Sequence, residues 1–157
     1  MILTPDDTLR ITEEPIADLL ETEMWPLLEQ HREELTTNKA LMALAPDVAR
    51  YRAAEAAGAL VALVARAGGD IVGYSINFVG QHLHYSALRY AHNDVLFVTK
   101  GARASVGLRL LRATREACAA HGAQMIAWHA KPDTPLAKML AVRRNTRLQD
   151  LIYTEVL

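Results

Sequence analysis

A run of small residues lies between an apolar segment and an amphipathic segment, an arrangement suited to binding an anion. Residues 93–111, NDVLFVTKGARASVGLRLL, predict a strand, a loop and the start of a helix. Backbone N–H groups of the loop and the first helical turn have no intrahelical partners, and the helix dipole adds positive potential there. The small residues that let a ligand approach the backbone are Gly101, Ala102, Ala104, Ser105 and Gly107. A phosphate site is one interpretation of this stretch, and an ordinary strand-to-helix turn is the other.

Titratable side chains gather shortly before this loop. Asp94 begins the predicted strand, and His84 lies in a bend that precedes it, with His82 and His92 nearby. A histidine can accept a proton near neutral pH, and a carboxylate can hold a water molecule or an ammonium group. The alternative is that Asp94 is only a turn or strand-end residue. His82, His84 and Asp94 are also ligand types that zinc accepts, but their spacing is common and we expect no metal site.

Composition excludes several classes of function. Seventeen basic residues against eighteen acidic ones give a net charge of −1, so the chain carries no broad positive field for nucleic acid. The single cysteine, Cys118, excludes an intramolecular disulfide and suits a reducing, cytoplasmic environment. The longest apolar run, residues 56–65, is too short to span a membrane. We therefore expect a cytoplasmic protein with neither nucleic acid nor membrane as a partner.

Apolar periodicity predicts the elements that position these groups within a single domain over residues 1–157. A first helix is predicted over residues 15–30, ended or kinked by Pro26, and a second over residues 47–57, ended by Gly58. Two strands, residues 60–65 and 71–79, are joined by a Gly68–Gly69 turn that suits an antiparallel hairpin.

The second half of the chain predicts an alternation of strands and helices. Residues 94–98 form a strand with little alternation, which predicts burial on both faces. A helix over residues 105–121 separates it from a buried strand over residues 124–130, so these two strands should be parallel. A short helix over residues 134–142, capped by Asp133 or Thr134, and a last strand over residues 148–156 complete the order.

This order of elements resembles the GCN5-related N-acetyltransferase (GNAT) family from Leu60 onward. The run Gly-Asp-Ile-Val-Gly-Tyr at residues 69–74 is similar to the hairpin before the family's central strands. The family's acetyl-CoA motif is Gln/Arg-x-x-Gly-x-Gly/Ala, followed by two residues and a Leu-Leu pair. Alignment on residues 110–111 places Ala102 at the Gln/Arg position, Ser105 at the first glycine and Gly107 at the second. Two of the three positions depart from the motif.

The resemblance implies an α/β (α+β) fold, with a central mixed, mostly antiparallel sheet, a parallel splayed strand pair and flanking helices. It implies acetyl-CoA as co-substrate and direct transfer of its acetyl group to a primary amine in a ternary complex. The backbone of the cofactor strand would pair with the pantetheine arm, and N–H groups at the helix start would hold the pyrophosphate. The residues assigned to the cofactor in this way are Leu96, Phe97, Val98, Arg103, Ala104, Ser105, Val106, Gly107, Leu108 and Thr134.

The catalytic residues implied by the resemblance are less well defined. His84 and Asp94 are the candidates for the base that removes a proton from the amine. Ala141 stands where many members have a tyrosine that protonates the leaving thiolate, so Tyr85, Tyr153 or solvent would have to supply that proton. The loss of this tyrosine leaves a non-catalytic acyl-CoA sensor as the second hypothesis, and a domain that has lost the cofactor as the third.

The acceptor and the assembly are the last expectations. In the family the first helices border the acceptor, which implies that His31, Glu33 and Glu34 contact a cationic amine, although an exposed charged helix end would have the same composition. The overall pattern also looks like acetyltransferases from phage and prophage genomes. Because the strand over residues 148–156 and its neighbour could leave an apolar edge exposed, we expect a homodimer.

Overall fold

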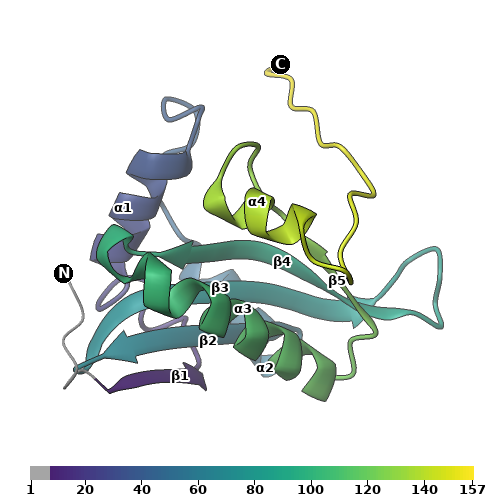
Figure 1. Ribbon diagram of the computed structural model, residues 1–157, viewed down its shortest axis with the longest axis horizontal. Helices are drawn as coiled ribbons and strands as arrows, with labels where there is room; N and C mark the ends of the chain where they lie inside the picture. Colours follow the sequence, from purple (N-terminus) through teal and green to yellow (C-terminus); the bar gives the residue numbers. More distant parts are fainter. Residues whose placement is uncertain (1–7) are drawn as a thin grey trace.

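The computed structural model describes residues 8–157 and contains a five-stranded sheet with the order β1-β2-β3-β4-β5 (Figure 1). The pairs β1–β2, β2–β3 and β3–β4 are antiparallel, whereas β4 and β5 are parallel. The prediction of a mixed, mostly antiparallel sheet with one parallel pair is therefore confirmed. The strands are β1 (Leu9–Glu13), β2 (Leu60–Ala67), β3 (Asp70–Gln81), β4 (Arg89–Val98) and β5 (Met125–Trp128).

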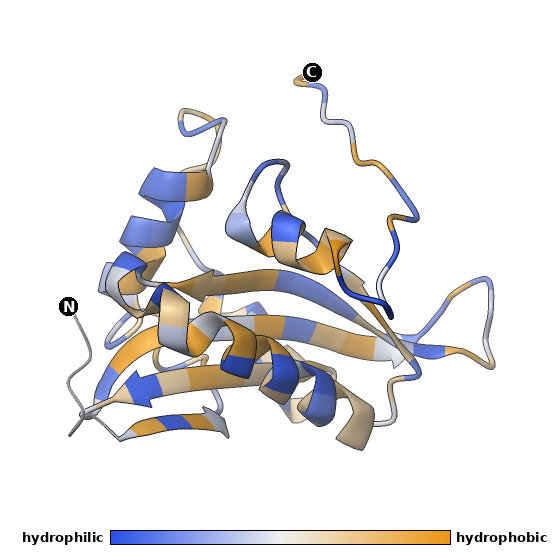
Figure 2. Cartoon of the chain, viewed as in Figure 1, coloured by the Kyte–Doolittle hydropathy of each residue, from blue (hydrophilic) through white to orange (hydrophobic). Residues whose placement is uncertain are grey.

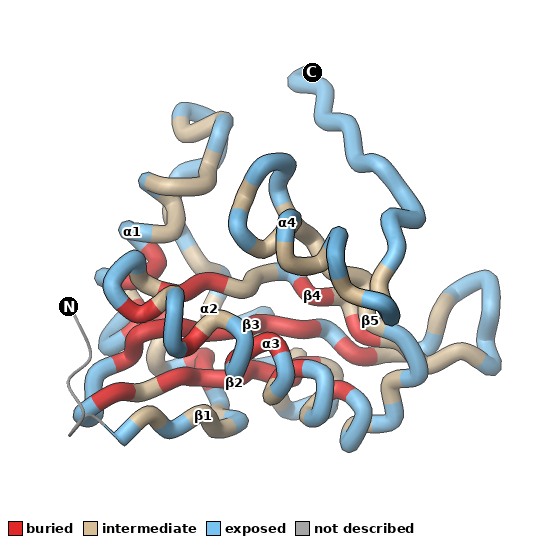
Figure 3. The backbone as a smooth tube through the Cα atoms, in the orientation of Figure 1, coloured by how far each residue is buried: buried red, intermediate tan, exposed pale blue. Residues whose placement is uncertain are grey.

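Helices cover both faces of the sheet. They are α1 (Trp25–Leu35), α2 (Val48–Ala56), α3 (Arg103–Ala120), which follows a short 3-10 turn η1 (Lys100–Ala102), and α4 (Pro135–Ala141). Val106, Leu110 and Cys118 of α3 pack on one face, against residues such as Val61 and Leu63 of β2. On the other face, α1 and α2 pack against residues that include Val64, Tyr74 and Phe97. The core is thus divided between two layers, and β2 and β3 are the most buried strands (Figure 3).

Local sequence explains most element ends. Asp47 accepts a hydrogen bond from the Arg50 N–H at 3.1 Å and begins α2, and Thr134 accepts one from the Ala137 N–H and begins α4. Gly122 has φ +84° after the end of α3, and Gly68 and Gly69 have positive φ in the β2–β3 turn. The predicted hairpin and the prediction of a helix over residues 105–121 are confirmed, with α3 beginning two residues earlier.

The predicted first helix over residues 15–30 is wrong. Residues 17–24 form turns, and α1 begins at Trp25 with Pro26 in its first turn. Proline is favoured there, because its fixed φ suits a helix and its missing N–H would have had no partner. Pro26 therefore begins a helix rather than ending one. Strand β1 was not predicted, and its side chains are at most half-buried because it is an edge strand.

The predicted last strand over residues 148–156 is also wrong. These residues have no regular structure and lie exposed, leading away from the sheet to the C-terminus (Figure 1). A strand needs a neighbour for its backbone groups, and β5, which has only four residues, offers a short edge. Leu148, Ile152 and Tyr153 remain 81 %, 69 % and 86 % exposed.

Two predictions of strand burial need correction. Residues 94–98 were expected to be buried on both faces, yet Asp94 is exposed and Val95 and Leu96 are half-buried. The sequence over residues 124–130 was expected to be a buried strand, but β5 ends at Trp128 and Met125 is 38 % exposed. Both differences have one cause: within residues 8–157, β5 pairs only with β4 and covers only part of it. Along β4, hydrophobic and hydrophilic stretches follow one another (Figure 2).

Candidate functional site

The parallel strands β4 and β5 separate before β4 ends. Their register runs from Tyr90 with Met125 to Asn93 with Trp128, where β5 stops, whereas β4 continues to Val98. Residues 94–98 therefore have β3 on one side and no strand on the other within the described part of the chain. An unpaired strand edge presents N–H and C=O groups that an extended ligand can bind as an added strand. This free edge of β4 contains three residues that the sequence assigned to the cofactor: Leu96, Phe97 and Val98.

A β-bulge marks the beginning of this free edge. Asn77 pairs with Asn93 and Ile76 pairs with Val95, so Asp94 is the extra residue. The buried side chain of Asn93 spans the bulge, because its Nδ2 donates to Asn77 Oδ1 at 2.8 Å and to the Val95 carbonyl at 3.0 Å. The bulge leaves Asp94 exposed. Sequence reasoning missed the roles of Asn77 and Asn93, although buried polar residues within two apolar strands were a usable signal.

The predicted anion loop joins the free edge of β4 to α3. The Ala102 N–H donates to the Thr99 carbonyl at 3.0 Å in the η1 turn, and the first turn of α3 follows at once. Ala104 and Ser105 are exposed there, and a Cβ at Gly107 would meet no atom within 4 Å. Ser105 Oγ donates to the Ala102 carbonyl at 3.2 Å. The backbone at the start of α3 is thus open to a ligand and carries the positive end of the helix dipole.

Arg103 and Glu34 form a link between α3 and α1. Arg103 Nη2 forms an ion pair with Glu34 Oε2, and Arg103 Nε donates to the Val98 carbonyl at 2.9 Å. The guanidinium also lies 5.8 Å from the centre of the Phe97 ring, within cation–π range. The Glu34 carboxylate, which the family resemblance assigned to the acceptor amine, is therefore paired with the helix that follows the anion loop.

His31 lies among aromatic side chains on the α1 side of the sheet. Its Nδ1 is 2.8 Å from the Tyr74 hydroxyl oxygen, and its ring stacks on Phe97 with centroids 4.9 Å apart. Burial lowers the pKa of His31, and the positive charge of Lys131 lowers it further, while the carboxylates of Asp94 and Glu34 oppose both effects. The imidazole is therefore neutral at pH 7.

The Asp94 carboxylate also affects the pKa values of two tyrosines, Tyr51 and Tyr74. Burial raises the pKa of Tyr74 far above its usual range, and Tyr51 and Asp94 add to the rise. Burial also raises the pKa of Tyr51, again with a contribution from Asp94. Both hydroxyls therefore stay protonated at neutral pH, and the negative charge of Asp94 acts on the same side of the sheet as His31.

A cavity of about 290 Å³ opens beside these groups. Its wall is formed by α1, the segment between α1 and α2, α2, β3 and β4, and it includes His31, Tyr51, Tyr74 and Val95. Val95 directly follows the bulge residue Asp94, so the cavity reaches the beginning of the free edge of β4. A molecule in this cavity would lie next to a ligand that is paired with β4.

A pair of histidines lies where β4 and β5 separate. His92 Nε2 is 3.3 Å from His129 Nδ1, and the two rings are 4.1 Å apart in an edge-to-face arrangement. Burial lowers the pKa of His92, His129 lowers it further, and Asp94 opposes the change. The sequence singled out His92 but not His129. A usable signal was that His129 directly follows the strand parallel to the predicted cofactor strand.

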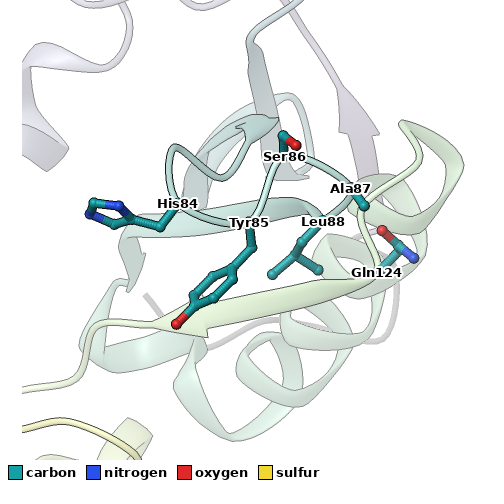
Figure 4. A pocket seen from close by; sticks show the side chains of 6 residues that line it. All are labelled: His84, Tyr85, Ser86, Ala87, Leu88 and Gln124. Carbon is teal, nitrogen blue, oxygen red and sulfur yellow. The ribbon is translucent and has the colours of Figure 1, made fainter.

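His84 and Tyr85 lie elsewhere, in the loop between β3 and β4. Both are exposed and line a separate cavity of about 510 Å³, together with Ser86, Leu88 and Gln124 (Figure 4). The β4 segment from Arg89 to Asp94 lies between this loop and the bulge, and an extended strand of that length spans roughly 17 Å. His82 accepts hydrogen bonds from the backbone N–H groups of His84 and Tyr85 and so shapes the loop. The structure thus brings His31 to the same side as Asp94 and leaves His84 and Tyr85 apart from both.

Comparisons with known proteins identify the fold. No protein-family model matches the sequence, and no relative is found among curated proteins. Solved structures of acetyltransferases nevertheless superpose along nearly the whole chain. An aminoglycoside acetyltransferase from an uncultured soil metagenomic sample is 22% identical, with a TM-score of 0.67, over 94% of this chain and 99% of that one. This chain has the GNAT acetyltransferase fold.

Two further structures with the GNAT fold show how varied its members are. A ribosomal-protein-alanine N-acetyltransferase from Brucella melitensis biovar Abortus 2308 is 18% identical, with a TM-score of 0.64, over 96% of this chain and 99% of that one. AAC(6')-Iy, in complex with the bisubstrate analog CoA-S-monomethyl-acetylneamine, is 15% identical, with a TM-score of 0.64 and the same two coverages. Identities this low support the fold and leave activity to be argued from the residues of this chain.

Residues 8–157 contain no group of three or more His, Cys, Asp or Glu side chains placed to hold a metal ion. None of the helices described there has the length and apolar character needed to cross a membrane.

Proposed function

We propose that the protein is an N-acetyltransferase that moves an acetyl group from acetyl-CoA to a primary amine by direct transfer in a ternary complex. The observation that carries this proposal is the free edge of β4, residues 94–98, which leads directly into the open first turn of α3. An extended thiol arm suits the strand edge, and a pyrophosphate suits the helix start. AAC(6')-Iy, which has the same fold, was solved in complex with a bisubstrate analog that contains CoA, which supports acetyl-CoA as the co-substrate.

The cofactor is assigned to the residues that the sequence predicted. The backbone of Leu96, Phe97 and Val98 would pair with the pantetheine arm. The N–H groups of residues 103–108 would surround the pyrophosphate, with Gly107 leaving space for it. Thr134, whose hydroxyl caps α4, is also assigned to the cofactor. Arg103 uses its side chain in the link to Glu34, and Ser105 and Thr134 use their hydroxyls in local hydrogen bonds. The backbone N–H of Arg103 remains part of the proposed site.

The reaction requires two proton transfers. The ammonium of the acceptor loses a proton to a base, and the neutral amine then attacks the thioester carbonyl carbon. As the C–N bond forms and the C–S bond breaks, the nitrogen gives up its second proton, and the leaving CoA thiolate takes up a proton, which yields the amide and free CoA. Thiols such as that of cysteine have a pKa of about 8.5, so a thiolate is a tolerable leaving group without the tyrosine that Ala141 replaces. A backbone N–H at the bulge is suited to stabilise the oxyanion.

Position favours Asp94 over His84 as the base. Asp94 is exposed at the beginning of the free edge and acts electrostatically on His31 beside the acceptor cavity. His84 and Tyr85, the alternative base and proton donor, would have to reach the thioester from the β3–β4 loop. His31 is assigned to contact the acceptor, and Glu34 to hold α1 against the start of α3.

The test compares acetyl-CoA binding with turnover in three variants. Asp94→Asn should lower the rate of thiol release by roughly two to four powers of ten, the usual effect of losing a general base, and keep the affinity for acetyl-CoA. His84→Gln should leave the rate near that of the parent protein. The double variant should resemble Asp94→Asn.

Three results would contradict this assignment in different ways. A large loss in His84→Gln alone would move the base to the β3–β4 loop. Acetyl-CoA binding without thiol release for any amine would favour the non-catalytic sensor, and the absence of any acetyl-CoA binding would favour a domain that has lost the cofactor. Isothermal titration calorimetry and a thiol-release assay distinguish these outcomes.

We also propose a cytoplasmic homodimer with no metal and with neither nucleic acid nor membrane as a partner. A reducing compartment suits the single, buried Cys118, whose pKa burial raises to about 11. Exposed apolar residues in the C-terminal segment support self-association. The likeness to phage and prophage acetyltransferases is retained as part of this proposal and rests on the His-x-His-Tyr run at residues 82–85, before the cofactor strand, and on a short acidic first helix.

A further inference from the structure

The cavity beside the bulge has an apolar wall. Nine of its lining residues have aliphatic or thioether side chains that offer no strong hydrogen-bonding group: Leu20, Leu28, Met42, Ala43, Leu44, Ala45, Pro46, Ile76 and Val95. Its volume of about 290 Å³ is at the lower end of the range for small-molecule sites, about 300–1,000 Å³. These two properties suit a small molecule with an apolar body.

The polar groups of the cavity are few, and some are already paired. His31 Nδ1 and the Tyr74 hydroxyl form a hydrogen bond with each other. The hydroxyls of Thr36 and Tyr51, which also line the cavity, have no side-chain partner within residues 8–157. Arg32 is the single charged residue in the lining, and its guanidinium donates to the carbonyls of Met42 and Lys39 at 3.0 and 2.8 Å. The lining therefore contains a fixed cation and no carboxylate.

The carboxylates near the cavity provide one free negative charge. Asp94 acts electrostatically on His31, Tyr51 and Tyr74, so its charge reaches the cavity from the bulge. Glu34 also acts on His31, but its carboxylate is neutralised by Arg103. Lys131 adds a positive charge on the same side. A ligand with several ammonium groups would find one carboxylate and two cations, Arg32 and Lys131.

We propose that the acceptor is a small monoamine: one ammonium group near Asp94, attached to an apolar aliphatic or aromatic body that fills the cavity. This inference rests on the proposed acetyl transfer and narrows its acceptor. It separates this chain from neighbours of the same fold that are aminoglycoside acetyltransferases, one of them solved in complex with sisomicin. Those acceptors carry several amines on polar rings, and the wall described above offers such groups few partners.

The first experiment measures thiol release from acetyl-CoA with a series of straight-chain primary amines, 2-phenylethylamine and sisomicin. All the monoamines present the same ammonium group, so any change along the series reports contact with the apolar body. We expect kcat/KM to rise by about fourfold for each methylene that enters the cavity, until the cavity is filled. The value for 2-phenylethylamine should exceed that for sisomicin by about tenfold or more.

The second experiment places a carboxylate in the wall. Met42 lines the cavity and is 52 % exposed, so Met42→Glu adds a negative charge there at little risk to the fold. Leu41 precedes it, is 67 % exposed and does not line the cavity, which makes Leu41→Glu a matched control. Met42→Glu should lower kcat/KM for 2-phenylethylamine by about tenfold and raise it for sisomicin, and Leu41→Glu should change neither.

The outcomes separate this inference from the proposed function. If sisomicin is acetylated faster than every monoamine, the monoamine inference is overturned and acetyl transfer stands. If acetyl-CoA does not bind, the proposed function itself is overturned. A readout without turnover is the binding of 2-phenylethylamine to the CoA-saturated protein. The amide NMR signals of Tyr51 and Val95 report this binding. Unchanged signals at high amine concentration would overturn the inference even if no amine reacts.

Discussion

Asp94 owes its exposure to a single extra residue in β4. Strands normally alternate side chains between two faces, and the bulge interrupts that alternation between Asn93 and Val95. The Asn93 amide fixes the interruption by bonding both to Asn77 and to the Val95 carbonyl. A carboxylate is thereby held at the point where the free edge of β4 begins, within electrostatic reach of His31. The two asparagines within apolar strands were a usable signal for a buried polar pair, but the position of the bulge depends on the register between β3 and β4, which the sequence does not show.

A prediction at the residue scale concerns the pH dependence of stability. Burial lowers the pKa of His31 in the folded protein, so the unfolded chain binds more protons as pH falls below the ordinary histidine pKa of about 6.5. The contribution of His31 is therefore fully present above that pKa and is lost as pH falls toward the folded pKa. The free energy of unfolding should decrease as pH is lowered through this window, and urea unfolding at several pH values measures it.

The variant His31→Asn should reduce this slope. His92, whose pKa burial also lowers, should account for part of what remains, so the double variant with His92→Asn should have the shallowest slope. Equal slopes in the parent protein and in both variants would show that neither imidazole changes its proton affinity on folding. Because His31 contacts Tyr74 and Phe97, the variants are compared by slope and not by absolute stability.

At the scale of elements, the essential unit is β4, the η1 turn and α3. It joins a strand edge that has no neighbour among residues 8–157 to a helix start with an open backbone, and the link between Arg103 and Glu34 attaches it to α1. Both features that are proposed to bind the cofactor are made of backbone. This explains how the loop can depart from the family motif at Ala102 and Ser105 and still present the N–H groups that an anion needs.

Gly107 provides the test of this unit. Gly107→Asp adds a side chain and a negative charge beside the first turn of α3, so it should abolish acetyl-CoA binding while the protein remains folded. Gly107→Ala is the matched control, because a Cβ there would meet no atom within 4 Å and alanine favours the helix. Calorimetric titration and circular dichroism measure both variants. Unchanged affinity in folded Gly107→Asp would exclude the α3 start as the pyrophosphate site.

Elements with a strong local signal were predictable, and those that depend on a partner were not. The inward face of α3 and the Gly68–Gly69 hairpin follow from periodicity and turn chemistry alone. Pro26 was misinterpreted because a proline within an apolar run is compatible both with the end of one helix and with the start of another. His129 was missed because its partner, His92, is distant in sequence and is reached only through the pairing of β4 with β5.

At the scale of the whole molecule, the C-terminal segment is the feature that the fold does not accommodate. Residues 148–157 have a sequence typical of a strand, yet they are exposed and carry large apolar side chains. Within the described residues, the edge strand β5 has no neighbour other than β4. An exposed apolar segment and an unpaired strand edge are both features that proteins commonly cover by association.

We therefore expect a homodimer in solution, held in part by the C-terminal segment. The double variant Leu148→Lys, Ile152→Lys adds two charges to that segment and should shift the protein to the monomer, because charges along a strand oppose its pairing with another chain. Leu83→Lys, which changes a still more exposed apolar residue in the β3–β4 loop, should leave the assembly unchanged. Light scattering over a wide range of concentration measures the mass of each protein. A monomer mass for the parent protein throughout that range would contradict the dimer, and a dimer that persists in the double variant would place the interface on another surface.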